Sequence, residues 1–172
     1  MATTLVTGAN RGIGLELCRQ LKARGDDVIA VCRKGSAELD ALNVRIEPGI
    51  DVSDSASIAQ LAKRLDDVEL DVLINNAGVL HAESLDRMRF DDIEKQFEIN
   101  ALGPLRVTMA LLPLLHDGSK VVIITSRMGS IGDNGSGGYY GYRMSKAAVN
   151  AAGVSLAHDL KGRGIAVGLF HP

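Results

Sequence analysis

The chain has 172 residues, of which 46% are hydrophobic and 23% charged, and this composition suits one globular domain with a sizeable core. Its formal net charge is -2 and no long basic run occurs, which argues against a nucleic-acid surface as the main function. No apolar run approaches the roughly 18 residues of a membrane span, and no secretory signal is visible, so we expect a cytoplasmic location. Cys18 and Cys32 sit in patterns that favour buried free thiols over a disulfide, and no His/Cys cluster indicates a metal.

The first half of the chain alternates short apolar runs with amphipathic segments. We expect strands at residues 3–7, 27–32, 44–47 and 71–74, and helices at 13–23 and 36–42. A third helix should run through Ile58 and Leu61, with Ser53 or Asp54 as its N-cap. Gly25 follows the first helix at the usual position of a C-terminal stop.

The second half continues the alternation with longer segments. We expect a loop at 79–89, a helix at 91–115, a strand at 120–125, a glycine-rich loop at 126–138, a helix at 139–161 and a strand at 165–169. Pro104 lies inside the first of these helices and should kink or bend it. Alternating strands and helices predict right-handed βαβ units. We therefore predict one Rossmann-type α/β domain over residues 1–172, with a doubly wound parallel sheet covered by helices on both faces.

A glycine turn joins the first strand to the first helix. From Gly8 to Gly14 the sequence is G-A-N-R-G-I-G, which differs in spacing from the G-x-G-x-x-G dinucleotide fingerprint but has the same mechanics. Gly8 permits the tight turn, Gly12 lets backbone approach a pyrophosphate, and Gly14 lets the helix pack close to the sheet. Backbone N–H groups and the helix N-terminus would then face the anion. This position after the first strand favours nucleotide binding over a plain glycine-rich turn.

The end of the second strand bears on the choice between NAD and NADP. An acidic residue there would accept a hydrogen bond from the ribose 2′-hydroxyl of NAD. The chain instead has Cys32, Arg33 and Lys34, and Arg11 lies nearby in the glycine turn. Cations without a carboxylate suit a 2′-phosphate, so we predict NADP(H). The alternative is that Arg33 and Lys34 are only solvated loop charges.

Asparagines occur at two further points of the predicted fold. Asn75-Asn76-Ala77-Gly78 follows the fourth strand, and ligands bind at the carboxyl ends of strands in open α/β sheets. The alternative is that Asn75 and Asn76 only form a turn. Asn100 interrupts the apolar pattern of the long helix, where its side chain either faces solvent or accompanies a kink near Pro104.

All three tyrosines lie between Tyr139 and Tyr142, and only Tyr142 has a lysine four positions on, at Lys146. Residues i and i+4 share one face of a helix. An ammonium held beside a phenol favours the phenolate form, which suits Tyr142 for proton transfer. The alternative is an aromatic residue at a helix start followed by a solvated lysine. Tyr139 and Tyr140 are candidates for lining a substrate pocket.

These motifs, in this order, resemble those of the short-chain dehydrogenase/reductase family, in its classical division. The resemblance rests on Thr7 to Gly14, Asn75 to Gly78, Asn100, Ser126 and Tyr142-x-x-x-Lys146. The stretch from Ser126 to Lys146 is most similar to the carbonyl reductase branch that includes sniffer and C-factor-like proteins. The resemblance spans nearly the whole chain. It implies an oxidoreductase that transfers a hydride between NADP(H) and a carbonyl or alcohol substrate.

The resemblance also implies a catalytic tetrad of Asn100, Ser126, Tyr142 and Lys146. Tyr142 would pass a proton to the carbonyl oxygen, and Ser126 would hydrogen-bond that oxygen. Lys146 would bind the nicotinamide ribose and assist Tyr142, and Asn100 would hold a water linked to Lys146. In the cofactor site, Asp51 and Val52 would contact the adenine, and Asn76 would contact the adjoining ribose. The full set of residues expected to bind the cofactor is Gly8, Asn10, Arg11, Gly12, Ile13, Gly14, Arg33, Asp51, Val52, Asn76, Ala77, Gly78, Tyr142 and Lys146.

Two departures from the family pattern matter. Ser126 lies sixteen residues before Tyr142, more than the commonest family spacing, so Ser130, at twelve residues, is a rival for the serine role. We favour Ser126 because it directly follows the fifth strand. The family continues after His171-Pro172 with a glycine, a substrate-binding segment and a final strand. We therefore expect the C-terminal strand and lid to be missing, which would leave the sixth strand as an exposed sheet edge.

Two classes of function remain. The leading hypothesis is an NADP-dependent carbonyl reductase or alcohol dehydrogenase. The alternative is a nucleotide-binding signalling or scaffold protein of the same fold with little or no turnover. We expect a small-molecule carbonyl or alcohol substrate, no nucleic-acid or membrane partner, and a candidate homodimer interface at helices 91–115 and 139–161.

Overall fold

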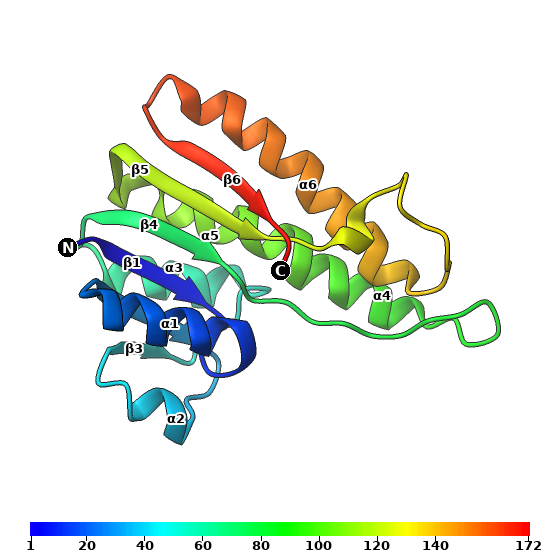
Figure 1. Ribbon diagram of the computed structural model, residues 1–172, viewed down its shortest axis with the longest axis horizontal. Helices are drawn as coiled ribbons and strands as arrows, with labels where there is room; N and C mark the ends of the chain where they lie inside the picture. Colours follow the sequence, from blue (N-terminus) through cyan, green and yellow to red (C-terminus); the bar gives the residue numbers. More distant parts are fainter.

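Parallel strands form a single sheet at the centre of the protein (Figure 1). The computed structural model describes all residues, 1–172. The strands are β1 (Thr3–Thr7), β2 (Asp27–Cys32), β3 (Arg45–Pro48), β4 (Leu70–Asn75), β5 (Leu115–Ile124) and β6 (Ala166–Phe170). They lie in the order β3-β2-β1-β4-β5-β6, and every neighbouring pair is parallel. The predicted doubly wound α/β fold is confirmed.

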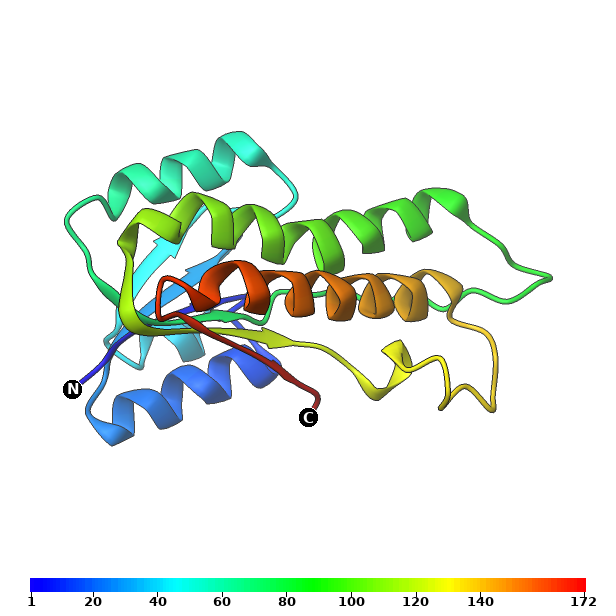
Figure 2. The same cartoon turned by 90° about the horizontal axis from the view of Figure 1, so that it is seen from above.

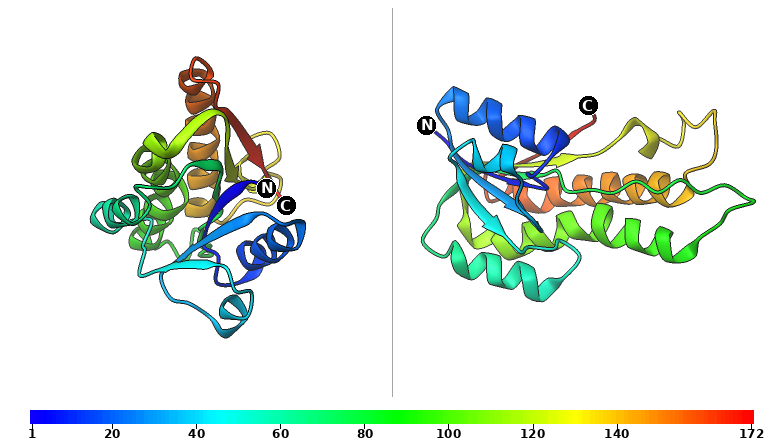
Figure 3. Two further views of the ribbon diagram at one scale, coloured as in Figure 1. Left: turned by 90° about the vertical axis from the view of Figure 1, so that its left-hand side faces the viewer. Right: turned by 90° about the horizontal axis from the view of Figure 1, so that it is seen from below.

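Helices cover both faces of the sheet, as Figures 2 and 3 show. On one face lie α1 (Gly12–Arg24) and the short α2 (Ala37–Asp40). On the other lie α3 (Ser55–Arg64), α4 (Phe90–Phe97), α5 (Gly103–Leu111) and α6 (Tyr140–Lys161). None of these helices combines the length and apolar character needed to cross a membrane.

The strands are continuously apolar because each face of the sheet packs against helices. Leu5 and Val6, adjacent on β1, are both fully buried but belong to separate clusters on opposite faces. The larger cluster lies under α3, α5 and α6, and the smaller one under α1 and α2. Cys18 and Cys32 are buried free thiols in the smaller cluster, as predicted. Burial raises the pKa of the Cys18 thiol to about 11.

Helix ends follow the sequence signals closely. Asp54, one of the two candidate caps, accepts hydrogen bonds from the N–H groups of Ala56 and Ser57 at the start of α3. Gly25 ends α1 with a φ of 93°, in the left-handed region that suits a C-terminal glycine. The expected glycine loop at 126–138 contains one short 3-10 turn, Arg127–Gly129.

The prediction of one helix over residues 91–115 was wrong in its continuity. A π-helical turn, Glu98–Leu102, separates α4 from α5, and a 3-10 turn, Leu112–Leu114, ends the segment. Pro104 has no N–H with which to continue the α-helical hydrogen bonding, and the wider turn before it accommodates its ring. Leu115 is already the first residue of β5. The irregular turn places Asn100 in its middle.

Candidate active site

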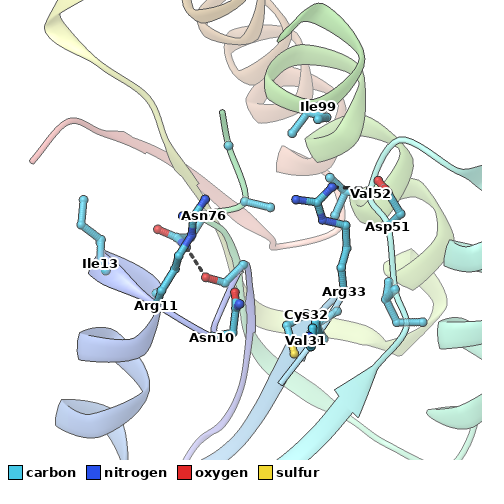
Figure 4. A pocket seen from close by; sticks show the side chains of 17 residues that line it. Asn10, Arg11, Ile13, Val31, Cys32, Arg33, Asp51, Val52, Asn76 and Ile99 are labelled. Atoms are coloured by element: carbon cyan, nitrogen blue, oxygen red, sulfur yellow. Dashed lines mark hydrogen bonds and ion pairs between the residues drawn. The ribbon is translucent and has the colours of Figure 1, made fainter. Parts of the chain in front are cut away.

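The carboxyl ends of β1, β2 and β4 border a cavity of about 890 Å³ (Figure 4). Because β1 lies between β2 and β4, the glycine turn and the segment 75–78 meet at this cavity. The residues expected from the sequence to contact a nucleotide, other than those on α6, all line it: Gly8, Asn10, Arg11, Gly12, Ile13, Gly14, Arg33, Asp51, Val52, Asn76, Ala77 and Gly78. Sheet order therefore unites motifs that are far apart in the sequence.

Close packing between the ends of β1 and β4 explains two of the glycines. Gly8 has a φ of 66°, and a Cβ there would lie 2.8 Å from the Cα of Ala77. A Cβ on Gly14 would lie 2.9 Å from the carbonyl carbon of Gly8. Nδ2 of Asn76 donates to the carbonyl oxygens of Thr7, at 2.9 Å, and of Gly8, at 3.2 Å. The Asn76 side chain thus holds the glycine turn against β4.

Sequence reasoning missed three apolar residues of the cavity wall, Val31, Ile50 and Ile99. All three are buried, and their side chains resemble those of any other core position in the sequence. Only the tertiary packing distinguishes them, because it decides which apolar residues of β2, of the segment after β3 and of the π-helical turn reach the cavity. Figure 4 shows Ile99, from the π-helical turn, on the side of the cavity opposite Asn10.

Asn100 joins three parts of the chain. Its side chain is 1% exposed, so the alternative in which it faces solvent is excluded. Oδ1 accepts from the N–H of Val79 at 2.9 Å, and Nδ2 donates to the carbonyl oxygen of Val79 at 2.8 Å. Nδ2 also donates to Oγ of Ser145 on α6 at 3.0 Å. Asn100 therefore fixes the chain after β4 against the helix that carries Tyr142 and Lys146.

Tyr142 and Lys146 lie one turn apart on α6, with Nζ of Lys146 5.7 Å from the centre of the Tyr142 ring. Lys146 is 4% exposed, and its Nζ donates to the carbonyl oxygen of Ile124 at 2.8 Å. A Cβ built on Gly78 would lie 3.8 Å from the same Nζ. The lysine is therefore not a solvated charge: it lies between the end of β5, the Tyr142 ring and the wall of the nucleotide-sized cavity.

The family model described as short chain dehydrogenase matches residues 2–172. This chain belongs to the short-chain dehydrogenase family.

Two curated relatives illustrate the family membership. The chain is 48% identical over 174 residues to 1-hydroxy-2-glutathionyl-2-methyl-3-butene dehydrogenase of Rhodococcus sp. (strain AD45), covering 100% of this chain and 77% of the relative. It is 51% identical over 106 residues to C-signal of Myxococcus xanthus, covering 60% of this chain and 64% of that protein. The chain thus spans between about two thirds and three quarters of the length of these relatives.

Solved structures agree with this membership. An NADPH-bound carbonyl reductase from chicken fatty liver superimposes with a TM-score of 0.89 at 32% identity, covering 100% of this chain and 79% of that one. A Caenorhabditis elegans protein described as carbonyl reductase Sniffer gives a TM-score of 0.92 at 34% identity, covering 99% of this chain and 85% of that one. The resemblance to the carbonyl reductase branch is confirmed.

Both candidate serines line a second cavity, of about 620 Å³, beside α6 and β6. Ser126 caps the 3-10 turn by accepting from the N–H of Met128 at 3.2 Å, and Ser130 accepts from the N–H of Asp133 at 3.3 Å. Neither serine hydrogen-bonds to Tyr142. The structure therefore brings Asn100, Tyr142 and Lys146 close to the first cavity and leaves the serine role as a prediction.

The cation at the end of β2 lies beside an acid in the wall of the first cavity. Nη1 of Arg33 lies 3.8 Å from Oδ2 of Asp51, and the Arg33 side chain is 60% exposed (Figure 4). Burial acts to raise the pKa of Asp51, but hydrogen bonds from Ser53 and the charge of Arg33 outweigh it and lower the pKa. Such an exposed ion pair is weak, so Arg33 is free to turn toward another anion.

Burial lowers the pKa of Lys146 to about 8. The unfolded chain keeps a lysine pKa of about 10.4, so between these values the unfolded state binds more protons and stability rises with pH. Below the lower value both states are protonated, and the buried ammonium opposes folding by about 3 kcal/mol.

We therefore expect the free energy of unfolding of wild type, relative to Lys146→Met, to rise by about 3 kcal/mol between pH 7 and pH 10.5. Urea unfolding of both proteins across this range measures the difference, and the variant cancels the titration of all other groups. If the difference in unfolding free energy between the two proteins did not change with pH, the lowered pKa of Lys146 would be contradicted.

Proposed function

We propose that this chain binds NADP(H) in the cavity at β1, β2 and β4 and transfers a hydride between that cofactor and a carbonyl or alcohol substrate. The position of Lys146 carries the proposal. Its buried Nζ lies beside the Tyr142 ring and next to Gly78 in the cavity wall. Burying a lysine without a carboxylate partner beside a phenol opposes folding, and nucleotide binding alone does not require this arrangement, whereas proton transfer by the phenol does.

The cavity suits a phosphorylated dinucleotide. The first turn of α1 has no acidic residue, so the helix N-terminus and the open glycine turn are suited to a pyrophosphate. Arg11, Arg33 and Lys34 supply exposed cations at the rim, which suits the 2′-phosphate of NADP. Binding of NADPH by the chicken carbonyl reductase supports the same choice.

The residues on α6 would handle the proton. Bound NADP(H) supplies the hydride in reduction and accepts it in oxidation. Tyr142 donates its phenolic proton to the carbonyl oxygen in reduction and takes up the hydroxyl proton in oxidation. Lys146 stabilises the phenolate that remains after donation. Asn100 holds the segment after β4 in a fixed position against α6. Ser126 is the proposed hydrogen-bond donor to the substrate oxygen.

Turnover of NADPH tests the proposal. Wild type is assayed for NADPH consumption with aldehydes, ketones and quinones, and for NADPH formation from NADP⁺ with primary and secondary alcohols. Turnover with at least one carbonyl–alcohol pair is expected. NADPH binding without turnover on any compound would refute the enzymatic proposal.

A second candidate is a nucleotide-binding protein with little turnover. The similarity to C-signal, a relative named for a signal rather than a reaction, is the observation that favours it. The same assay separates the two, because this candidate requires binding alone. A homodimer through α4, α5 and α6 stays a prediction, which the molecular mass in solution tests.

Arg33 should determine the preference between the two cofactors. We expect Arg33→Ala to lower the ratio of NADPH affinity to NADH affinity about tenfold or more, because a charge-assisted contact to the 2′-phosphate is lost. Titration of both cofactors by fluorescence measures the ratio. Arg19→Ala, an exposed arginine on α1 outside the cavity, is the matched control. An unchanged ratio in Arg33→Ala would contradict the role of this cation.

A further inference from the structure

A buried acid and a buried amide lie where the loop 79–89 meets the start of α6. Glu83, in the loop, is 3% exposed, and Gln96, on α4, is fully buried. Neither belongs to the sequence motifs or lines the nucleotide-sized cavity. None of the basic residues of the loop forms an ion pair with Glu83, and two of them, His81 and Arg89, pair with Asp92 instead. A buried carboxylate without a cation needs another source of stabilisation.

Hydrogen bonds from two elements supply that stabilisation. Oε2 of Glu83 accepts from the backbone N–H of Gly141 at 3.2 Å, in the first turn of α6. Oε1 of Glu83 accepts from Nε2 of Gln96, whose Oε1 accepts from the N–H of His81 at 2.9 Å. The carbonyl oxygen of Glu83 accepts from the N–H of Tyr139 at 2.9 Å. Loop, α4 and α6 are thus joined at one point, directly before Tyr142.

The backbone at the start of α6 is adapted to this junction. A Cβ on Gly141 would lie 2.9 Å from the Cα of Ile93 and 3.1 Å from Oε1 of Glu83, so a side chain there would force α4 and the acid away from the helix. Tyr139 has a φ of 52°, in the left-handed region that a non-glycine residue adopts at a cost of about 1–3 kcal/mol. Such strain persists only where the surroundings over-determine the conformation.

We propose that Glu83, held by Gln96, is a positioning residue that sets where Tyr142 lies relative to the nucleotide-sized cavity, an inference that rests on the proposed function. The junction requires a carboxylate at position 83, because two N–H donors, from Gly141 and Gln96, each point at one of its oxygens. In Glu83→Gln the side chain would have only one oxygen to accept a hydrogen bond, and its NH₂ group would face the second donor. The negative charge also complements the positive end of the α6 dipole. Tyr142 follows within the same helical turn, so loss of the junction shifts its hydroxyl.

Kinetics of a matched set of variants test the role. We expect Glu83→Gln to lower kcat about 10- to 100-fold, since a displacement of about 1 Å in a reacting group has effects of this size. NADPH affinity and substrate KM should stay within about twofold, because neither depends on a near-attack position of the phenol. The reciprocal variant Glu83→Gln/Gln96→Glu keeps a donor–acceptor pair between the two side chains and restores the charge, but it loses the hydrogen bond from Nε2 of Gln96 to the carbonyl oxygen of Asp92. It should therefore recover part of the kcat that the single variant loses. Glu94→Gln, an exposed acid on α4, makes the same charge change outside the junction and should match wild type.

Hydrogen exchange gives a measure that does not require activity. Glu83→Gln should speed amide exchange in residues 139–146 and leave the strands unchanged. If wild type shows no turnover, the proposed function fails, yet faster exchange confined to 139–146 still supports the junction. Wild-type kcat in Glu83→Gln, unchanged exchange at 139–146, or a parallel loss of NADPH affinity and kcat would each overturn the positioning role.

Discussion

Replacing Tyr142 with phenylalanine is expected to lower kcat about 1,000-fold while NADPH affinity stays within about threefold, since general acid–base groups contribute about 10² to 10⁴. The change removes one oxygen from a half-buried ring and leaves the helix and the cavity in place. Single-turnover rates with saturating NADPH and the best carbonyl substrate measure the chemical step, and fluorescence titration measures cofactor binding.

The other two tyrosines provide controls of the same chemistry. Tyr139→Phe and Tyr140→Phe remove the same atom within three residues of Tyr142, but neither ring has a lysine one turn later. Both should keep kcat within about threefold of wild type. Equal kcat values in wild type and Tyr142→Phe would disprove proton transfer by Tyr142. A large loss of kcat in Tyr139→Phe alone would assign proton transfer to Tyr139.

Gly14→Ala is expected to abolish measurable NADPH binding. The new Cβ would overlap the carbonyl group of Gly8 and approach Nδ2 of Asn76 to 2.5 Å. Relief requires either the start of α1 or the glycine turn to move, which separates the backbone N–H groups from the pyrophosphate. We also expect a loss of about 2–4 kcal/mol in the free energy of unfolding, as for other overpacked buried sites.

Gly132→Ala is the matched control, because it lies in an exposed loop, has no atom within 4 Å of a new Cβ and no positive φ. Titration with NADPH and urea unfolding compare the two variants. If Gly14→Ala bound NADPH within about tenfold of wild type, the glycine turn would not be the pyrophosphate site.

The sequence predicted those parts of the site that follow from strand ends. Apolar runs located β1, β2 and β4, and the residues after each run could be placed at one sheet edge because parallel strands share their direction. The spacing between Tyr142 and Lys146 singled out one tyrosine of three, and the burial of Lys146 agrees with that choice.

Other features depend on contacts that no local pattern records. The π-helical turn at Glu98–Leu102 accommodates Pro104. The sequence alone is equally compatible with a kink and with a bulge at this proline. Glutamate and glutamine usually lie at the protein surface, and Glu83 and Gln96 are buried only because α4 and α6 meet at Gly141. The choice between Ser126 and Ser130 likewise depends on tertiary contacts, since the glycine loop 126–138 has no hydrophobic periodicity from which its course could be predicted.

The central position of β1 ties the order of folding to the direction of synthesis. A nascent chain that has reached Pro48 can pair β1 with β2 and β2 with β3, but the other edge of β1 stays open until β4 emerges, because Thr4 pairs with Val72. An open edge on an apolar strand invites wrong pairing. Asn76 bonds to Thr7 and Gly8 only after β4 has docked. The step that closes this edge therefore also brings the glycine turn against residues 76–78 of the cavity wall, and a ligand of that cavity would favour the correctly paired chain over its misassembled forms.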